Sequence, residues 1–116
     1  MSLLLNEMKD VIYLIHARDT DNYKIGITSQ KNLDQRLKAL QTGNSYKLVI
    51  LKTVITKHAS LVERRLHRDF KFVHQEGEWF MLSSDDVNGF ELMCDKIIND
   101  IDFLVNMGNP FIIKNK

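Results

Sequence analysis

The chain has 116 residues, of which 44% are apolar and 27% charged, the composition of one ordinary globular domain with a modest core. Its single cysteine, Cys94, excludes an intramolecular disulfide, and no apolar run approaches the ~20 residues of a membrane helix. The first residues lack a basic region followed by a long apolar stretch. The sequence therefore predicts no signal peptide and a soluble, cytoplasmic protein.

The charge is divided unevenly along the chain. The formal net charge is only +1, but residues 22–74 contain eleven lysines and arginines against three acidic residues. That segment therefore carries +8 and the remainder −7, which is typical of a protein with a surface for a polyanion. The alternatives are two oppositely charged surfaces that keep the protein soluble, or a head-to-tail protein interface.

The first predicted elements are a hairpin and a helix. Residues 11–16 and 23–28 are short runs of β-branched and aromatic side chains, separated by a turn rich in Asp, Asn and Thr. Gly26 inside the second run marks a bulge, or a place where another group approaches the backbone closely. Residues 32–41 carry leucines at helical spacing, with Ser29 as the expected N-cap.

The later elements are a strand, a helix and an extended segment. Residues 48–55 form the most apolar strand, which predicts a central position in the sheet. Residues 59–70 have the apolar spacing of a second helix, and residues 78–82 look extended and partly buried. Cys94 lies among apolar residues, so we expect a small buried side chain there and not a nucleophile.

A long C-terminal helix completes the predicted α/β fold. It begins at a cap supplied by Ser83 or Ser84, carries acidic residues in its first turn, and ends near Val105. The expected organisation is a short N-terminal extension, one domain, a C-terminal helix packed on or extending that domain, and a tail. Their boundaries are residues 1–10, 11–82, 83–106 and 107–116.

Ionisable residues from four elements are expected to converge. On helical wheels Arg36 and Glu63 lie at the edges of their apolar stripes, about 65° and 55° from the centres. His67 follows Glu63 by one turn on the same side. Tyr13 and Lys24 come from the two strands of the hairpin. A tyrosine, a lysine, an arginine and a carboxylate can then meet in one cleft beside the sheet.

That set of groups suits the hydrolysis of a phosphodiester bond. A carboxylate holds a hard cation such as Mg²⁺, which stabilises charge on the phosphoryl oxygens and the leaving group. An arginine clamps the phosphate with two hydrogen bonds. A phenol or an amine of lowered pKa positions and deprotonates the attacking water.

Each residue also has an ordinary structural explanation. Core packing suits a tyrosine in a buried strand, solvation suits Lys24 and Arg36, and an ion pair suits Glu63. A histidine such as His67 more often caps or packs than binds a ligand. The aromatic residues at 79 and 80 are expected in the core, with a base-stacking platform as the alternative.

The order of the motifs resembles the GIY-YIG nuclease superfamily. Its first signature, Gly-Ile-Tyr, is matched by residues 11–13, and its second, Tyr-Ile-Gly, by residues 24–26, where Lys24 stands in place of the tyrosine. The family's arginine matches Arg36, and its glutamate, in an Ala-x-x-x-Glu-x-x-Leu helix, matches Glu63.

The finer pattern resembles a phage-type branch, named for a T5 phage open reading frame and a meiotically up-regulated fungal gene product. Its hallmarks are matched by residues 23–28, 36–44, 63–70 and 77–80, so the resemblance covers about residues 11 to 82. Leu40 stands where the family often has Tyr or His, and Glu78 stands near a late asparagine of the family.

The resemblance implies a small three-stranded antiparallel sheet flanked by helices, and metal-dependent cleavage with Mg²⁺ or Mn²⁺. Tyr13 would orient or activate water, Arg36 would bind the scissile phosphate, and Glu63 would be the only protein ligand of the metal. Lys24 would act as a base or a phosphate contact, and His67 would supply a polar group.

We therefore predict an endonuclease, with DNA favoured over RNA as its substrate. Three further basic residues are expected to contact nucleic acid: Lys38, Arg64 and Arg68. The sequence contains no base-recognition element that we can identify, so a protein partner or a fused specificity subunit is expected. The alternative function is a catalytically inactive nucleic-acid-binding module on the same scaffold.

Overall fold

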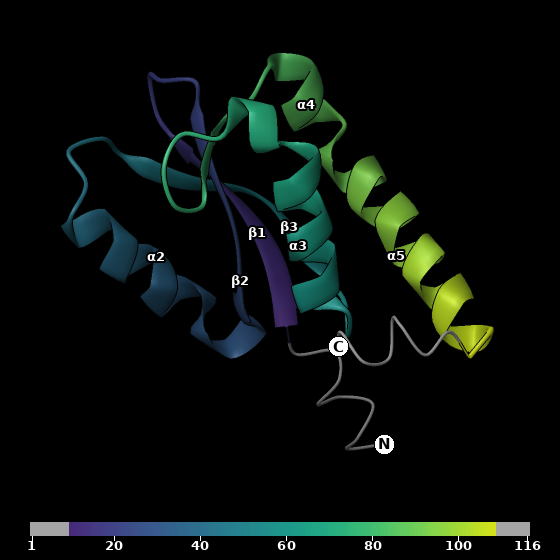
Figure 1. Cartoon of the computed structure of the whole chain (residues 1–116). Helices are drawn as coiled ribbons and strands as arrows, with labels where there is room; N and C mark the ends of the chain where they lie inside the picture. Colours follow the sequence, from purple (N-terminus) through teal and green to yellow (C-terminus); the bar gives the residue numbers. More distant parts are fainter. Residues whose placement is uncertain (1–9, 109–116) are drawn as a thin grey trace.

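The computed structural model describes residues 10–108 of the chain. Residues 1–9 of the predicted N-terminal extension and residues 109–116 of the predicted tail lie outside them. The elements in chain order are β1 (Asp10–Ala17), β2 (Asn22–Ser29), η1 (Gln30–Asn32), α2 (Leu33–Thr42), β3 (Leu48–Ile55), α3 (Ala59–Asp69), η2 (Lys71–Val73), β4 (Trp79–Met81), α4 (Ser84–Asn88) and α5 (Phe90–Asn106). They form an α+β fold in which α2 covers one face of the sheet and α3 and α5 cover the other (Figure 1).

The antiparallel sheet has four strands in the order β3-β1-β2-β4, so the prediction of three strands is wrong. The added strand, β4, spans three residues and pairs with residues 22–24 of β2. A run of three residues is too short to show the alternation that identifies a strand. The sequence therefore showed an extended segment, but not its pairing.

The predicted central position of β3 is also wrong, because β3 forms an edge of the sheet. Its burial alternates, and Leu51 and Ile55 are 40% and 43% exposed. The central strand with both faces covered is β1, in which residues 11–15 are all buried. Since side chains alternate along a strand, Ile12 points to the α3 and α5 face and Tyr13 to the α2 face.

The two faces have cores of unequal size. On one face α3 and α5 bury apolar side chains such as Leu66 and Phe90 against β1 and β2. Cys94 of α5 belongs to this core, as predicted, and burial raises the pKa of its thiol to about 12. On the other face α2 has no buried residue, and its three leucines, themselves only partly buried, pack over a small buried cluster around Tyr13.

The predicted long C-terminal helix is divided at Gly89 into α4 and α5. Ser83 begins α4 with a capping box, in which its hydroxyl and backbone bond reciprocally with Asp86. The Gly89 backbone, at φ −91° and ψ 3°, leaves the helical region and donates its N–H to the Asp85 and Val87 carbonyls. Apolar spacing alone did not reveal this break, because it continues across the glycine.

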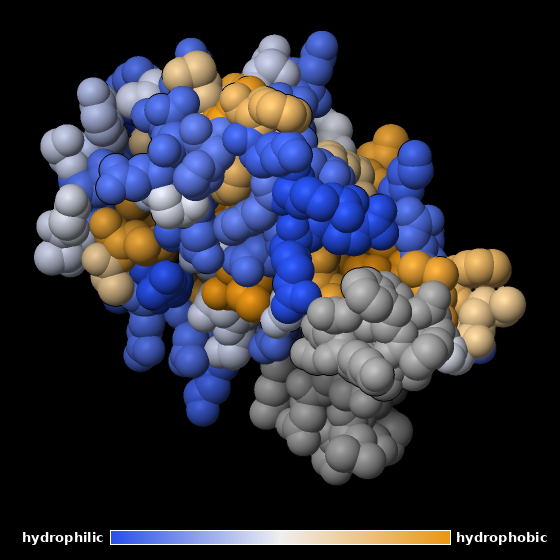
Figure 2. Space-filling view, viewed as in Figure 1, coloured by the Kyte–Doolittle hydropathy of each residue, from blue (hydrophilic) through white to orange (hydrophobic). Residues whose placement is uncertain are grey.

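The surface is mostly hydrophilic over the face seen in Figure 2. Apolar residues reach the surface toward the C-terminal end of α5, where Phe103 is 64% and Met107 71% exposed. Within residues 10–108, no helix combines the length and the apolar character needed to cross a membrane.

Candidate active site

The candidate site lies where β4 ends along the edge of β2. β4 pairs with β2 only as far as Lys24, so the backbone of Ile25 finds other partners. Its N–H donates to the Glu78 carbonyl at 3.1 Å, and its carbonyl accepts from His67 Nε2 at 2.9 Å. These two bonds bring α3 and the turn before β4 to the same point of the sheet edge.

Tyr13 and Arg36, both predicted site residues, meet on the α2 face. The register pairs Tyr13 with Gly26, and a Cβ added to this glycine would overlap the phenol. The close approach predicted at Gly26 is therefore confirmed, and the approaching group is the side chain of Tyr13. Arg36 Nε donates a long hydrogen bond of 3.5 Å to the phenolic oxygen.

The Tyr13 phenol is not the base of lowered pKa that the sequence suggested. Burial raises its pKa, and the neighbouring Arg36 guanidinium only partly offsets that effect. The phenol therefore keeps its proton at neutral pH. Its side chain is fully buried in this structure, and its proton makes it a hydrogen-bond donor and not a base.

A carboxylate pair lies beside the phenol. Lys24 Nζ forms an ion pair with Glu78 Oε1 at 3.1 Å, and its side chain is only 9% exposed. Burial, and then the charge and hydrogen bond of Glu78, raise the pKa of Glu63 to about 7, although Lys24 opposes the rise. Glu63 Oε2 is buried without a hydrogen-bond partner among the described residues. Such an oxygen is available to coordinate a cation.

His67 completes this cluster from the next turn of α3. The Ile25 carbonyl can only accept, so His67 Nε2 carries a proton, and in the neutral ring Nδ1 has the lone pair. One ligand atom from each of Glu63, His67 and Glu78 lies within 4.8 Å of the other two. Two carboxylates and an imidazole held by a backbone carbonyl suit a divalent cation of the Mg²⁺ or Mn²⁺ type.

A family model for the T5orf172 domain matches residues 10–97. The chain belongs to the T5orf172 domain family. This is the phage T5 type associated with the GIY-YIG-like nuclease fold, which confirms the resemblance inferred from the motifs. The family consists of nuclease-like or nucleic-acid-associated modules. Neither the comparison with curated proteins nor that with solved structures found a match.

The other predicted residues of this T5orf172 domain lie outside the cluster. Lys38 on α2 and Arg64 on α3 are exposed. Arg68 is exposed too, and its guanidinium lies 3.5 Å from the Asp69 carboxylate. All three side chains are exposed, and none belongs to the core.

Sequence reasoning gave no role to Glu78, although it noted the residue's place beside the family's late asparagine. The only available signal was that position, directly before Trp79 in a family motif. Phe80 is buried as predicted. Trp79 is half-buried and packs against the core cluster around Tyr13, with Lys24 Nζ lying 5.7 Å from the centre of its ring.

Proposed function

We propose that this T5orf172 domain is an endonuclease that hydrolyses phosphodiester bonds in DNA with the help of Mg²⁺ or Mn²⁺. The observation that carries the proposal is the buried, unpartnered oxygen of Glu63, within reach of two other ligand groups and beside Tyr13 and Arg36. A fold that only bound nucleic acid would gain nothing from two half-buried carboxylates beside a phosphate-binding arginine.

The phosphate-binding groups are Arg36 and Lys24. Arg36 is exposed and contacts Tyr13 through Nε, so both terminal nitrogens of its guanidinium group can bond phosphate oxygens. Lys24 is ion-paired with Glu78, and an ion-paired ammonium has no electron pair with which to accept a proton. This favours the role of phosphate contact for Lys24 over that of a base.

The remaining groups act on the metal and the water. Glu63 holds the cation, with His67 and Glu78 as additional ligands. When bound, the cation stabilises negative charge on the phosphoryl oxygens and the leaving group. The protonated phenol of Tyr13 donates a hydrogen bond that orients the attacking water. The lone pair at His67 Nδ1 either completes the ligand set or accepts the proton of that water.

The exposed basic residues supply binding strength without sequence recognition. We assign Lys38, Arg64 and Arg68 to phosphates on either side of the scissile bond, where each neutralised phosphate makes binding more sensitive to salt. Sequence specificity then comes from a bound or fused protein partner.

The test is the nicking of supercoiled plasmid by the full chain with Mg²⁺, Mn²⁺ or EDTA. Glu63→Gln keeps the shape of the side chain but removes its charge, and should abolish metal-dependent nicking. The matched control is Glu91→Gln, an exposed carboxylate on α5, which should cleave like the wild type.

Two outcomes would reject the proposal. Nicking that persists in Glu63→Gln would exclude the metal role of Glu63. If no metal supports nicking although DNA binding is retained and falls with salt, the protein is the binding module that the sequence left as the alternative.

A further inference from the structure

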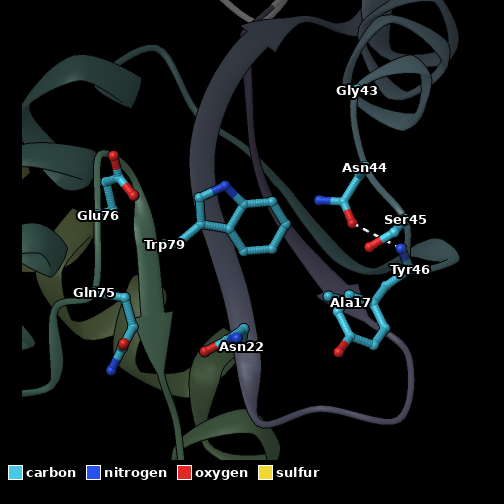
Figure 3. A pocket seen from close by; sticks show the side chains of 9 residues that line it. All are labelled: Ala17, Asn22, Gly43, Asn44, Ser45, Tyr46, Gln75, Glu76 and Trp79. Atoms are coloured by element: carbon cyan, nitrogen blue, oxygen red, sulfur yellow. Dashed lines mark hydrogen bonds between the residues drawn. The ribbon is translucent and has the colours of Figure 1, made fainter.

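A pocket with a cavity volume of about 370 Å³ opens between the loop after α2 and the turn before β4 (Figure 3). Trp79 forms one wall, and Tyr46 and Asn44 approach from the opposite side. The other polar side chains that line it are Asn22, Ser45, Gln75 and Glu76. The volume lies in the range of small-molecule sites in proteins.

The wall that faces Trp79 is held in place before any ligand binds. Gln41 Nε2 donates to the Asn44 and Tyr46 carbonyls at 3.3 and 2.8 Å, and Gln41 Oε1 accepts from the Leu48 N–H at 2.8 Å. Asn44 Oδ1 accepts from the Tyr46 N–H at 2.9 Å. Its amide nitrogen is therefore left as a donor, and it points toward Trp79.

The wall on the Trp79 side is also ordered by the backbone. Gln75 donates its N–H to the Trp79 carbonyl, and Trp79 donates its N–H to the Glu76 carbonyl, both at 2.9 Å. These two bonds hold this turn closed. The pocket is thus lined by rigid segments, which lowers the entropy cost of binding a flat ligand.

The lining selects against phosphate and for a heteroaromatic ring. None of the described residues that line the pocket is a lysine or an arginine, and Glu76 would repel an anion. Two aromatic side chains offer stacking surface, and three amides with one carboxylate offer donors and acceptors at the edge of a ring. A nucleobase has both a stacking face and such an edge.

The pocket adjoins the catalytic cluster. Trp79 follows Glu78 directly, and Lys24 lies between them, 3.1 Å from the Glu78 carboxylate and 5.7 Å from the indole centre. We infer that the pocket binds an unpaired nucleobase of the strand whose phosphate lies at Arg36 and Lys24, with the base stacked on Trp79. A paired base cannot enter, so the domain acts on single-stranded or distorted DNA. This inference rests on the proposed function.

The chain's only tryptophan reports directly on this binding. The full chain, kept in EDTA to prevent cleavage, is titrated with a single-stranded oligonucleotide and with an abasic strand that carries the same number of phosphates. The strand with bases should quench the fluorescence of Trp79 and bind about 5- to 100-fold more tightly, the range expected for stacking of one base. Equal quenching and equal affinity for the two strands would overturn the inference.

Tyr46→Ala sharpens the test, because it keeps the fluorescent tryptophan. Tyr46 is 50% exposed, so its truncation does not threaten folding. The variant should lose affinity for the strand with bases and keep its affinity for the abasic strand, while Asn99→Ala on the exposed side of α5 should match the wild type on both. An equal loss on both strands would contradict a base pocket.

The two proposals can fail separately. If neither supercoiled plasmid nor single-stranded DNA is cleaved with Mg²⁺ or Mn²⁺, but base-dependent quenching is present, the endonuclease is rejected and the nucleobase pocket stands. If nicking is present but quenching does not depend on bases, the pocket is rejected and the endonuclease stands.

Discussion

On one face of the sheet, α3 and α5 cover a core in which Leu66 and Phe90 are completely buried, whereas on the other face α2 contributes no buried residue. Both faces use the same central strand, because alternate residues of β1 point to opposite sides. The face covered by α3 and α5 supplies stability. The α2 face places the fully buried Tyr13 one hydrogen bond away from Arg36, an exposed side chain that a ligand can reach.

The sharpest test of this contrast compares one leucine from each face. Leu66→Ala should lower the free energy of unfolding by about 2–5 kcal/mol, because it opens a cavity in a fully buried site. Leu37→Ala on α2 should lower it by about 1 kcal/mol, because this side chain is only half-buried. Urea unfolding of both variants provides the measurement. Losses of equal size would show that the two faces stabilise the fold equally.

A second prediction concerns the close contact between Gly26 and the Tyr13 phenol on the α2 face. Gly26→Ala would push the phenol of Tyr13 away from the site, since the new Cβ overlaps it. A displacement of this kind should lower the rate of plasmid nicking by about 100-fold. The control is Gly89→Ala at the junction of α4 and α5, remote from the cluster, which should cleave like the wild type. An unchanged rate in Gly26→Ala would remove Tyr13 from the mechanism.

The smallest effect is expected from the titration of Glu63 in the metal-free protein. Its folded pKa, about 7, lies above the ordinary value of 4.5, so the stability linked to this group is present at low pH. That stability is lost as the pH rises through about 7. Between about pH 5 and about pH 8, wild type should lose about 1–2 kcal/mol relative to Glu63→Gln, after allowance for solvent screening.

Urea unfolding in EDTA at the two pH values measures this difference. Mg²⁺ should restore stability to wild type at the higher pH, because a ligand that binds only the folded state stabilises it, and should not affect Glu63→Gln. Glu91→Gln serves as the control and should follow the wild type throughout. Parallel pH profiles for Glu63→Gln and wild type would contradict the raised pKa.

Much of the fold and part of the site could be predicted from local patterns. The strand around Tyr13 and the helix that carries Glu63 followed from apolar runs and from helical spacing. The close approach at Gly26 followed from a glycine inside a strand. The four-stranded sheet and the edge position of β3 could not be predicted, because strand order depends on which edges meet after the chain has folded.

The sequence by itself determined the family and most of the elements, because side-chain spacing and element order are local properties of the chain. Only the tertiary structure decided that Glu78 shares the site with Glu63, and that one side of Trp79 faces a pocket. Both depend on the three-residue pairing of β4 with β2, which brings segments more than fifty residues apart into register. Burial, which raises the pKa of both Tyr13 and Glu63, likewise exists only once those segments have packed.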